Sequence, residues 1–159
     1  MGWEYLWILA VVSAALCAVG FYKFVYFLSI GYGFAIAGLG VAILILFRQQ
    51  AAFVHVIQCL LFLAYGARLS GFLLYREIKN AAYRKTLAEA TTAEKGMPVF
   101  VKACIWIFVT VLYVAQVSPV FYRQYNGVGD TLLPWIGVII SIAALIIESL
   151  ADKQKSQQK

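Results

Sequence analysis

Two side chains in the middle of an apolar stretch have the chemistry of a proton donor and a supporting cation. Tyr65 and Arg68 stand three residues apart within a largely apolar block at 51–75. On a helix this spacing places both on adjacent turns of one face, so a guanidinium would lie beside a phenol. A neighbouring cation stabilises a developing phenolate and so favours proton donation. The pair therefore predicts either a catalytic acid with its partner or a hydrogen-bonded pair without chemistry.

The other polar residues of this block fall on the same helical face: His55, Gln58, Tyr75 and Arg76. Polar side chains inside a bilayer are costly, so those that share one face of a helix usually line a cavity or contact one another. We expect Gln58 to line a polar cavity with Tyr65. Tyr75 and Arg76 have a simpler explanation, because aromatic and basic side chains are common at the membrane interface. The simpler explanation for His55 is a local hydrogen bond.

A second polar stripe follows in the next apolar block, where Lys102, Trp106, Tyr113 and Gln116 recur at helical spacing. We expect Tyr113 and Gln116 to face the same substrate cavity as Gln58. Hydrogen bonding within a helix bundle, with no ligand, is the alternative explanation for this stripe.

Three charged residues share one helical face where the last apolar block ends. Glu148, Asp152 and Lys155 follow one another at spacings of four and three. One explanation is a surface ladder of ion pairs, worth a few tenths of a kcal/mol. The other is a polar platform for the head of a cofactor, completed by cations of the preceding basic loop.

The blocks that position these residues are membrane spans. Of 159 residues, 64% are hydrophobic and only 13% are charged, whereas soluble proteins are about half apolar. Each apolar block is long enough, at about 1.5 Å per residue, to cross a hydrocarbon core of about 30 Å. We therefore predict an all-α, polytopic membrane protein with a single transmembrane domain over 1–159. Its five expected spans are 3–21, 24–47, 51–75, 97–122 and 131–150.

The distribution of basic residues predicts the orientation. One side of the membrane would carry Lys23, Arg76, Lys79, Arg84, Lys85, Lys95, Lys102, Lys153, Lys155 and Lys159, and the other only Arg48 and Arg123. The positive-inside rule places the first side in the cytoplasm, together with the loop 76–96 and the polar tail 151–159. The net charge of +6 thus reflects membrane topology, and we expect no nucleic-acid partner.

Several features refine this outline. Gly33 and Ala37 predict a close helix contact, with room for a ligand as the alternative. Pro119 is expected to kink or end the fourth span. The basic loop 76–96 is expected to extend the third helix into the headgroups, against anionic lipid. The three cysteines, all within spans, lack metal-ligand spacing and are expected to be buried, so we predict no metal site.

The first block lacks the basic residues that precede a cleavable signal peptide, since the first charge is Glu4. We therefore expect it to be a retained span. The sequence also lacks an Asn-x-Ser/Thr acceptor for glycosylation. These features favour an integral protein of a bacterial inner membrane.

The chain resembles the N-terminal part of the steroid 5-alpha-reductase-like superfamily, in particular its bacterial-type branch of membrane reductases. The resemblance covers essentially the whole chain. It rests on YGARL at 65–69, FLLYR at 72–76, QVSP at 116–119 and, most specifically, ESLADKQK at 148–155.

The resemblance implies a seven-span enzyme that uses NADPH to reduce a polarised carbon–carbon double bond in a lipid substrate, such as an enone steroid. Tyr65 matches the tyrosine that holds or protonates the substrate carbonyl, and Arg68 matches the arginine one turn along. Asp152, with Glu148 and Gln154 near it and Lys155 on the same platform, matches the start of the NADPH site. The family pairs the tyrosine with a glutamate of the second span, and here the second block contains no acid.

The family's remaining cofactor residues lie in two further spans. The resemblance therefore implies that this chain is an N-terminal part, with an incomplete NADPH site. We expect either a lipid-directed reductase or, as the alternative, a non-catalytic module that binds lipid or a membrane partner. Such a partner could be a second copy of the chain or a protein that supplies further spans.

Overall fold

The computed structural model describes residues 2–94 and 96–157, and every regular element in them is helical. Five segments are long and apolar enough to cross a bilayer, as the composition predicted: Trp3–Phe21, Phe24–Leu46, Phe53–Lys79, Val99–Tyr125 and Leu132–Lys155. The helices are α1 (Trp3–Cys17), α2 (Ile30–Leu46), α3 (Phe53–Lys79), α4 (Ala81–Glu94), α5 (Val99–Tyr125) and α6 (Leu132–Gln157), with the 3-10 turns η1 (Ala18–Phe21) and η2 (Phe24–Phe27).

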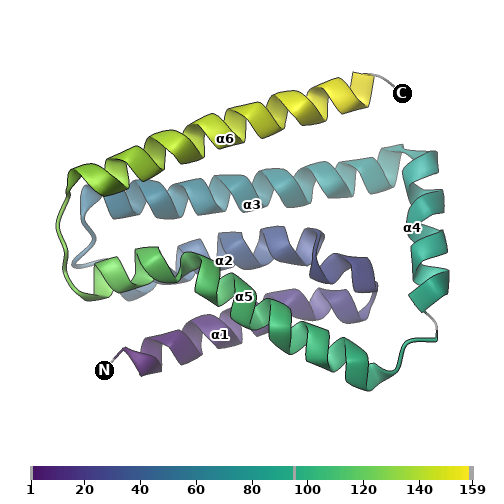
Figure 1. The fold of residues 1–159 in the computed structure, drawn as a ribbon, viewed down its shortest axis with the longest axis horizontal. Helices are drawn as coiled ribbons and strands as arrows, with labels where there is room; N and C mark the ends of the chain where they lie inside the picture. Colours follow the sequence, from purple (N-terminus) through teal and green to yellow (C-terminus); the bar gives the residue numbers. More distant parts are fainter. Residues whose placement is uncertain (1, 95, 158–159) are drawn as a thin grey trace.

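The long helices run back and forth, so that the two ends of the described chain lie at opposite ends of the bundle (Figure 1). The short helix α4 lies across the end that α3 and α6 reach with their C-terminal turns (Figure 1). The basic residues Arg76 and Lys79 of α3 and Arg84 and Lys85 of α4 all lie at this end of the bundle, the end that the positive-inside rule assigns to the cytoplasm.

Helices α2 and α3 approach each other closely because both present small residues at their crossing. A methyl group added to Gly66 would overlap the carbonyl oxygen of Gly33 and would lie 2.8 Å from the Cβ of Ala37. The prediction of a close helix contact at Gly33 and Ala37 is therefore confirmed. In a bilayer such contacts matter more than apolar burial, because lipid tails are as apolar as the side chains.

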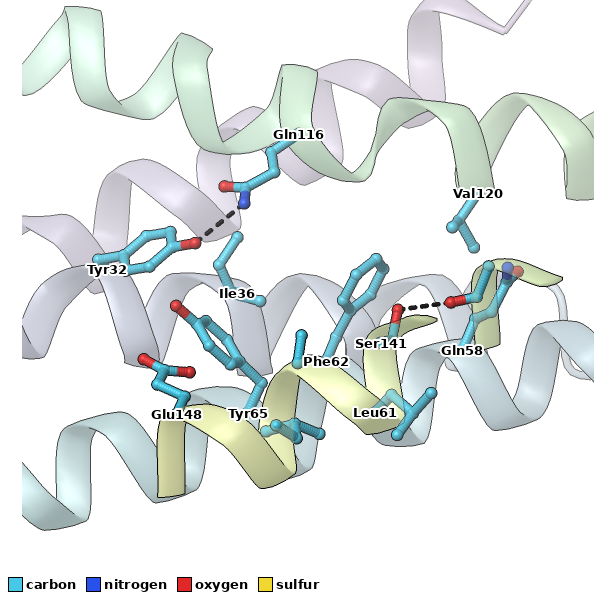
Figure 2. A pocket seen from close by; sticks show the side chains of 13 residues that line it. Tyr32, Ile36, Gln58, Leu61, Phe62, Tyr65, Gln116, Val120, Ser141 and Glu148 are labelled. Atoms are coloured by element: carbon cyan, nitrogen blue, oxygen red, sulfur yellow. Dashed lines mark hydrogen bonds between the residues drawn. The ribbon is translucent and has the colours of Figure 1, made fainter. Parts of the chain in front are cut away.

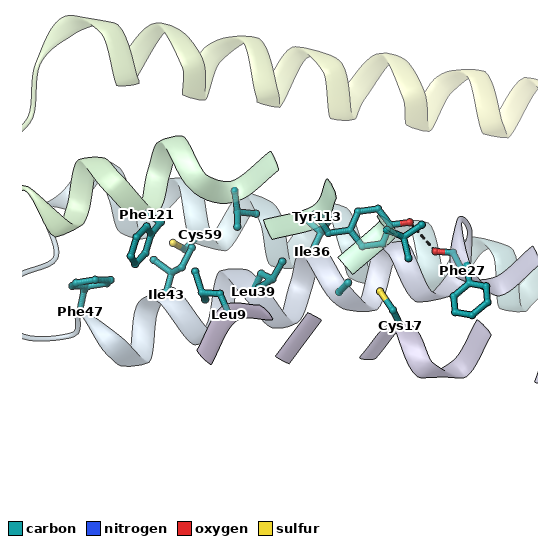
Figure 3. Packing of buried hydrophobic residues seen from close by; sticks show 13 residues of the cluster. Leu9, Cys17, Phe27, Ile36, Leu39, Ile43, Phe47, Cys59, Tyr113 and Phe121 are labelled. Atoms are coloured by element: carbon teal, nitrogen blue, oxygen red, sulfur yellow. Dashed lines mark hydrogen bonds between the residues drawn. The ribbon is translucent and has the colours of Figure 1, made fainter. Parts of the chain in front are cut away.

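Aromatic and aliphatic side chains from α1, α2, α3 and α5 fill the space around this crossing (Figure 3). Phe27, Ile36, Leu39, Val117 and Phe121 are among the buried residues there. In contrast, α6 lies outside this cluster, alongside α3 in Figure 1, and most of its apolar side chains are exposed. Of the five candidate spans, the one formed by α6 is the least buried.

The structure refines three local expectations. The second span is present, but its helix is interrupted between η2 and α2, where Ser29 leaves the helical conformation with φ −121° and ψ −96°. The third helix extends into the loop 76–96 only as far as Lys79, because Asn80 is extended and α4 starts anew. Pro119 was expected to kink or end the fourth span, and it does not end α5, which continues to Tyr125. The carbonyl of Ala115, which loses its helical partner at Pro119, accepts a hydrogen bond from the Ser118 hydroxyl at 2.7 Å.

Of the three cysteines, Cys17 and Cys59 are buried as expected, but Cys104 is exposed on α5. A thiol is apolar enough to face acyl chains, so this position does not require burial in the protein.

Candidate functional site

A cavity of about 310 Å³ lies between α2, α3, α5 and α6, and we call it the central cavity (Figure 2). Its size lies at the lower end of the range for small-molecule sites. Apolar side chains form most of its wall, with a few polar groups among them. The lining residues that carry hydrogen-bonding side chains are Tyr32, Gln58, Tyr65, Gln116, Ser141 and Glu148.

Tyr65 reaches the central cavity from the middle of α3. Its ring meets the edge of the Tyr32 ring at a centroid distance of 5.9 Å. Its hydroxyl lies on the same side of the cavity as the Tyr32 hydroxyl and the Glu148 carboxylate (Figure 2). The structure thus places the predicted proton donor in a cavity, near a second phenol and an acid.

Tyr32 was missed by the sequence analysis. It lies on α2, and its hydroxyl accepts a hydrogen bond from the side-chain amide of Gln116 at 2.9 Å (Figure 2). Because the Tyr32 oxygen accepts this bond, its own proton remains available for donation. The signal that could have identified Tyr32 is a phenol within a span that is otherwise almost free of polar side chains, four residues before Ile36 on the same helical face.

Gln58 lies toward the other end of the central cavity, as predicted (Figure 2). Its side-chain oxygen is buried and has no hydrogen-bond partner among the described residues. A buried acceptor without a partner costs free energy, which a ligand hydroxyl or amine would recover. The central cavity therefore offers a free acceptor at Gln58 and phenolic donors at Tyr65 and Tyr32.

Arg68 binds two carboxylates of α6 instead of serving Tyr65 alone. One guanidinium nitrogen lies 2.8 Å from Glu148, and the other pairs with Asp152. The three side chains are only partly exposed. Glu148 therefore makes two kinds of contact: it lines the central cavity and also forms an ion pair with Arg68.

The four predicted cofactor residues do not form one group. Glu148 and Asp152 face α3 and bind Arg68, whereas Gln154 is exposed. Two residues correspond to about 200° of helical rotation, so Gln154 faces away from Asp152. Lys155 lines a separate cavity with the end of α3.

Tyr113 does not line the central cavity, contrary to expectation. It is buried behind Tyr32, with ring centroids 4.9 Å apart, and its hydroxyl donates to the carbonyl of Phe27 at 2.7 Å (Figure 3). The interruption of the second span leaves this carbonyl without a helical partner, and Tyr113 supplies one. Its role here is to support the fold.

His55 is also buried, near the outer end of α3. Neither of its ring nitrogens has a hydrogen-bond partner among the described residues, so the simple hydrogen-bond explanation given for it from the sequence is wrong for this structure.

The central cavity can bind a molecule that is largely apolar and carries a carbonyl or hydroxyl group. Two phenols and the Gln116 amide offer donors near one end, and Gln58 offers an acceptor toward the other.

A family model described as a protein of unknown function, DUF1295, matches residues 9–159. No curated protein and no solved structure matches the chain.

Proposed function

The chain belongs to the DUF1295 family of membrane proteins of unknown function, and from its central cavity we propose that it is a membrane-embedded, NADPH-dependent reductase-like protein. Its substrate would be a lipid or steroid-like molecule with a carbon–carbon double bond polarised by a carbonyl group. The membrane would be a bacterial inner membrane, with the basic ends of the helices in the cytoplasm.

One observation carries this proposal: Tyr65 and Tyr32 lie together, with Glu148, on one side of a cavity within the membrane-spanning part (Figure 2). When a hydride adds to the β-carbon of an enone, the double bond shifts and negative charge develops on the carbonyl oxygen. Donors placed at that oxygen stabilise the charge most effectively where water is excluded.

In this proposal Tyr65 donates a hydrogen bond to the carbonyl oxygen and then transfers its proton there as the charge develops. The resulting enol returns to the ketone by moving that hydrogen to the α-carbon, so the product gains one hydride and one proton. Tyr32, held by Gln116, supports the same oxygen as a second donor. Glu148 is the acid in the cavity lining, and its carboxylate would take up a proton from solvent and pass it to the Tyr65 phenolate.

The residues near the cytoplasmic end have the chemistry that NADPH requires. Carboxylates such as Glu148 and Asp152 accept hydrogen bonds from ribose hydroxyls, and cations such as Arg68 and Lys155 bind phosphate. The Arg68 ion pairs are partly exposed at this end, so the cluster is within reach of a ligand from the cytoplasm. Gln154 would contribute only from the exposed side of α6. When bound, NADPH would supply the hydride.

A direct test is to titrate NADPH into the purified chain in lipid nanodiscs and to follow its oxidation with a lipid-soluble enone. We expect saturable binding that Asp152→Asn weakens and that Lys85→Gln, at an exposed position on α4, leaves unchanged. Enone-dependent oxidation would support the reaction itself. If the folded wild-type chain does not bind NADPH, the proposal is contradicted.

A non-catalytic membrane module is the second candidate. The observation in its favour is that Arg68 already pairs with both Glu148 and Asp152, which reduces the hydrogen-bonding capacity that these groups offer to a cofactor. The exposed apolar face of α6 would then contact lipid, a second copy of the chain or a partner with further spans. Saturable binding of a lipid in the central cavity without any NADPH binding would favour this module over the reductase.

A further inference from the structure

The bend between α3 and α4 encloses a second cavity, of about 800 Å³, which we call the elbow cavity. The end of α3, the start of α4 and the end of α6 contribute to its wall. All its charged lining residues are cations: Arg76, Lys79 and Lys155. A concave surface with charges of one sign concentrates ligands of the opposite sign.

The acids closest in sequence to these cations are already engaged elsewhere. Glu77 accepts a hydrogen bond from the Tyr26 hydroxyl at 2.6 Å and pairs with Lys23. The hydrogen bond that Lys23 donates to Glu77 raises the pKa of the Lys23 amino group, which keeps the pair charged.

Glu148 and Asp152 are engaged in the same way, because both bind Arg68. Among the described residues, the three cations of the elbow cavity therefore form no ion pair. Their mutual repulsion is relieved if an anion lies between them.

Arg76 is held in position without losing its hydrogen-bonding capacity. Its guanidinium carbon lies 4.6 Å from the centre of the Tyr83 ring and 5.6 Å from that of Phe72. A guanidinium stacked on aromatic rings keeps its N–H groups, which point outward in its plane, available for the oxygen atoms of a ligand. This geometry suits the paired oxygens of a phosphate group.

The start of α4 adds backbone donors to these cations. Ala81 and Ala82 line the elbow cavity, and they precede the amide of Tyr83, which the Asn80 side chain already caps at 3.0 Å. Amides in the first turn of a helix have no partner within the helix and point along the positive end of its dipole. They strengthen an anion site that the three cations define.

The elbow cavity also lies at the end of a candidate membrane span, since α3 ends at Lys79, and the positive-inside rule assigns this end to the cytoplasm. Tyr75 and Phe72 belong to its wall, and α4 lies across this end of the bundle (Figure 1). Leu87 of α4 packs near Tyr26 and Ile30. Basic pockets between helices on the cytoplasmic side are typical sites for anionic lipid headgroups.

We propose that the elbow cavity is a phosphate-binding site, filled by the phosphate of an anionic phospholipid of the cytoplasmic leaflet or of a soluble phosphate compound. The site shares Lys155 with the proposed NADPH site, but none of its lining residues lines the central cavity, so phosphate binding here does not require the proposed reduction.

The experiment measures phospholipid binding to the purified chain by native mass spectrometry, with phosphatidic acid and phosphatidylcholine as probes. The test variant is Lys79→Gln with Lys155→Gln, which keeps the stacked Arg76 in place. The matched control is Lys85→Gln, which removes a cation from an exposed position on α4 outside the cavity. Thermal unfolding of each variant verifies that the bundle remains folded.

We expect wild type to prefer phosphatidic acid, and the double variant to lose about tenfold or more in affinity, given the contribution of each cation near a membrane surface. Lys85→Gln should change affinity by less than about twofold. Competition by inorganic pyrophosphate would support a soluble source of the phosphate, and its failure to compete would support the lipid source. Equal losses in the double variant and the control, or equal binding of both lipids, would overturn the proposal.

Discussion

Arg68 of α3 and Glu148 of α6 form an ion pair of 2.8 Å beside the central cavity. This pair connects the helix that carries the candidate proton donor to the least buried helix of the bundle. Asp152, one turn further along α6, pairs with the same guanidinium. The position of α6, and with it one wall of the cavity, therefore depends on a small number of charged contacts.

Replacing Arg68 by alanine should loosen α6. Two neighbouring carboxylates would lose their cation, and we expect a loss of about 1–3 kcal/mol in the free energy of unfolding, less than for a fully buried pair. Ser149→Ala, on the exposed side of α6, is the control and should be close to neutral. Unfolding in mixed detergent micelles measures both, and a spin-label distance between α3 and α6 reports the separation. An unchanged distance and stability would show that the ion pair does not hold α6.

Tyr65→Phe should abolish most of the proposed turnover while leaving NADPH affinity nearly unchanged. The variant keeps the ring that packs on Tyr32 and removes only the hydroxyl that faces the cavity. Loss of a positioned acid typically lowers a rate by about 10²–10⁴-fold. Tyr75→Phe, an exposed tyrosine outside the central cavity, is the control. Wild-type turnover by Tyr65→Phe would remove Tyr65 from the mechanism.

Gly66→Ala should destabilise the bundle strongly. The added methyl group would overlap the carbonyl oxygen of Gly33 on α2, so the two helices must separate. We expect a cost of about 1–3 kcal/mol or more, typical of overpacking. Gly71→Ala, one and a half turns along the same helix, meets no atom within 4 Å and should be neutral or slightly stabilising. Equal thermal stability of the two variants would contradict the close crossing of α2 and α3.

Tyr113→Phe should affect stability and not ligand binding. The change leaves the Phe27 carbonyl without its hydrogen bond, at a cost of about 1 kcal/mol, as for other buried hydrogen bonds in membrane proteins. Tyr122→Phe, at an exposed position on α5, provides the comparison. A selective loss of lipid or enone binding in Tyr113→Phe, with unchanged stability, would indicate that Tyr113 contacts the ligand in the central cavity.

The sequence alone was sufficient for the five apolar spans, because bilayer thickness acts on local composition. The orientation that the positive-inside rule gives stays a prediction. The small-residue contact at Gly33 and the location of Gln58, Tyr65 and Gln116 on inward faces also followed from helical periodicity. These properties depend on the sequence of a single helix and not on how the helices pack together.

Only the tertiary structure decided which inward residues meet. Periodicity gives the face of a helix but not its neighbour or its depth, so it could not separate Tyr113, which supports the interrupted second span, from Tyr32, which lines the cavity. It also could not show that Arg68 would bind the carboxylates of α6, or that Lys155 would join Arg76 and Lys79. Such contacts depend on how helices distant in sequence pack together, and that packing is a property of the whole bundle.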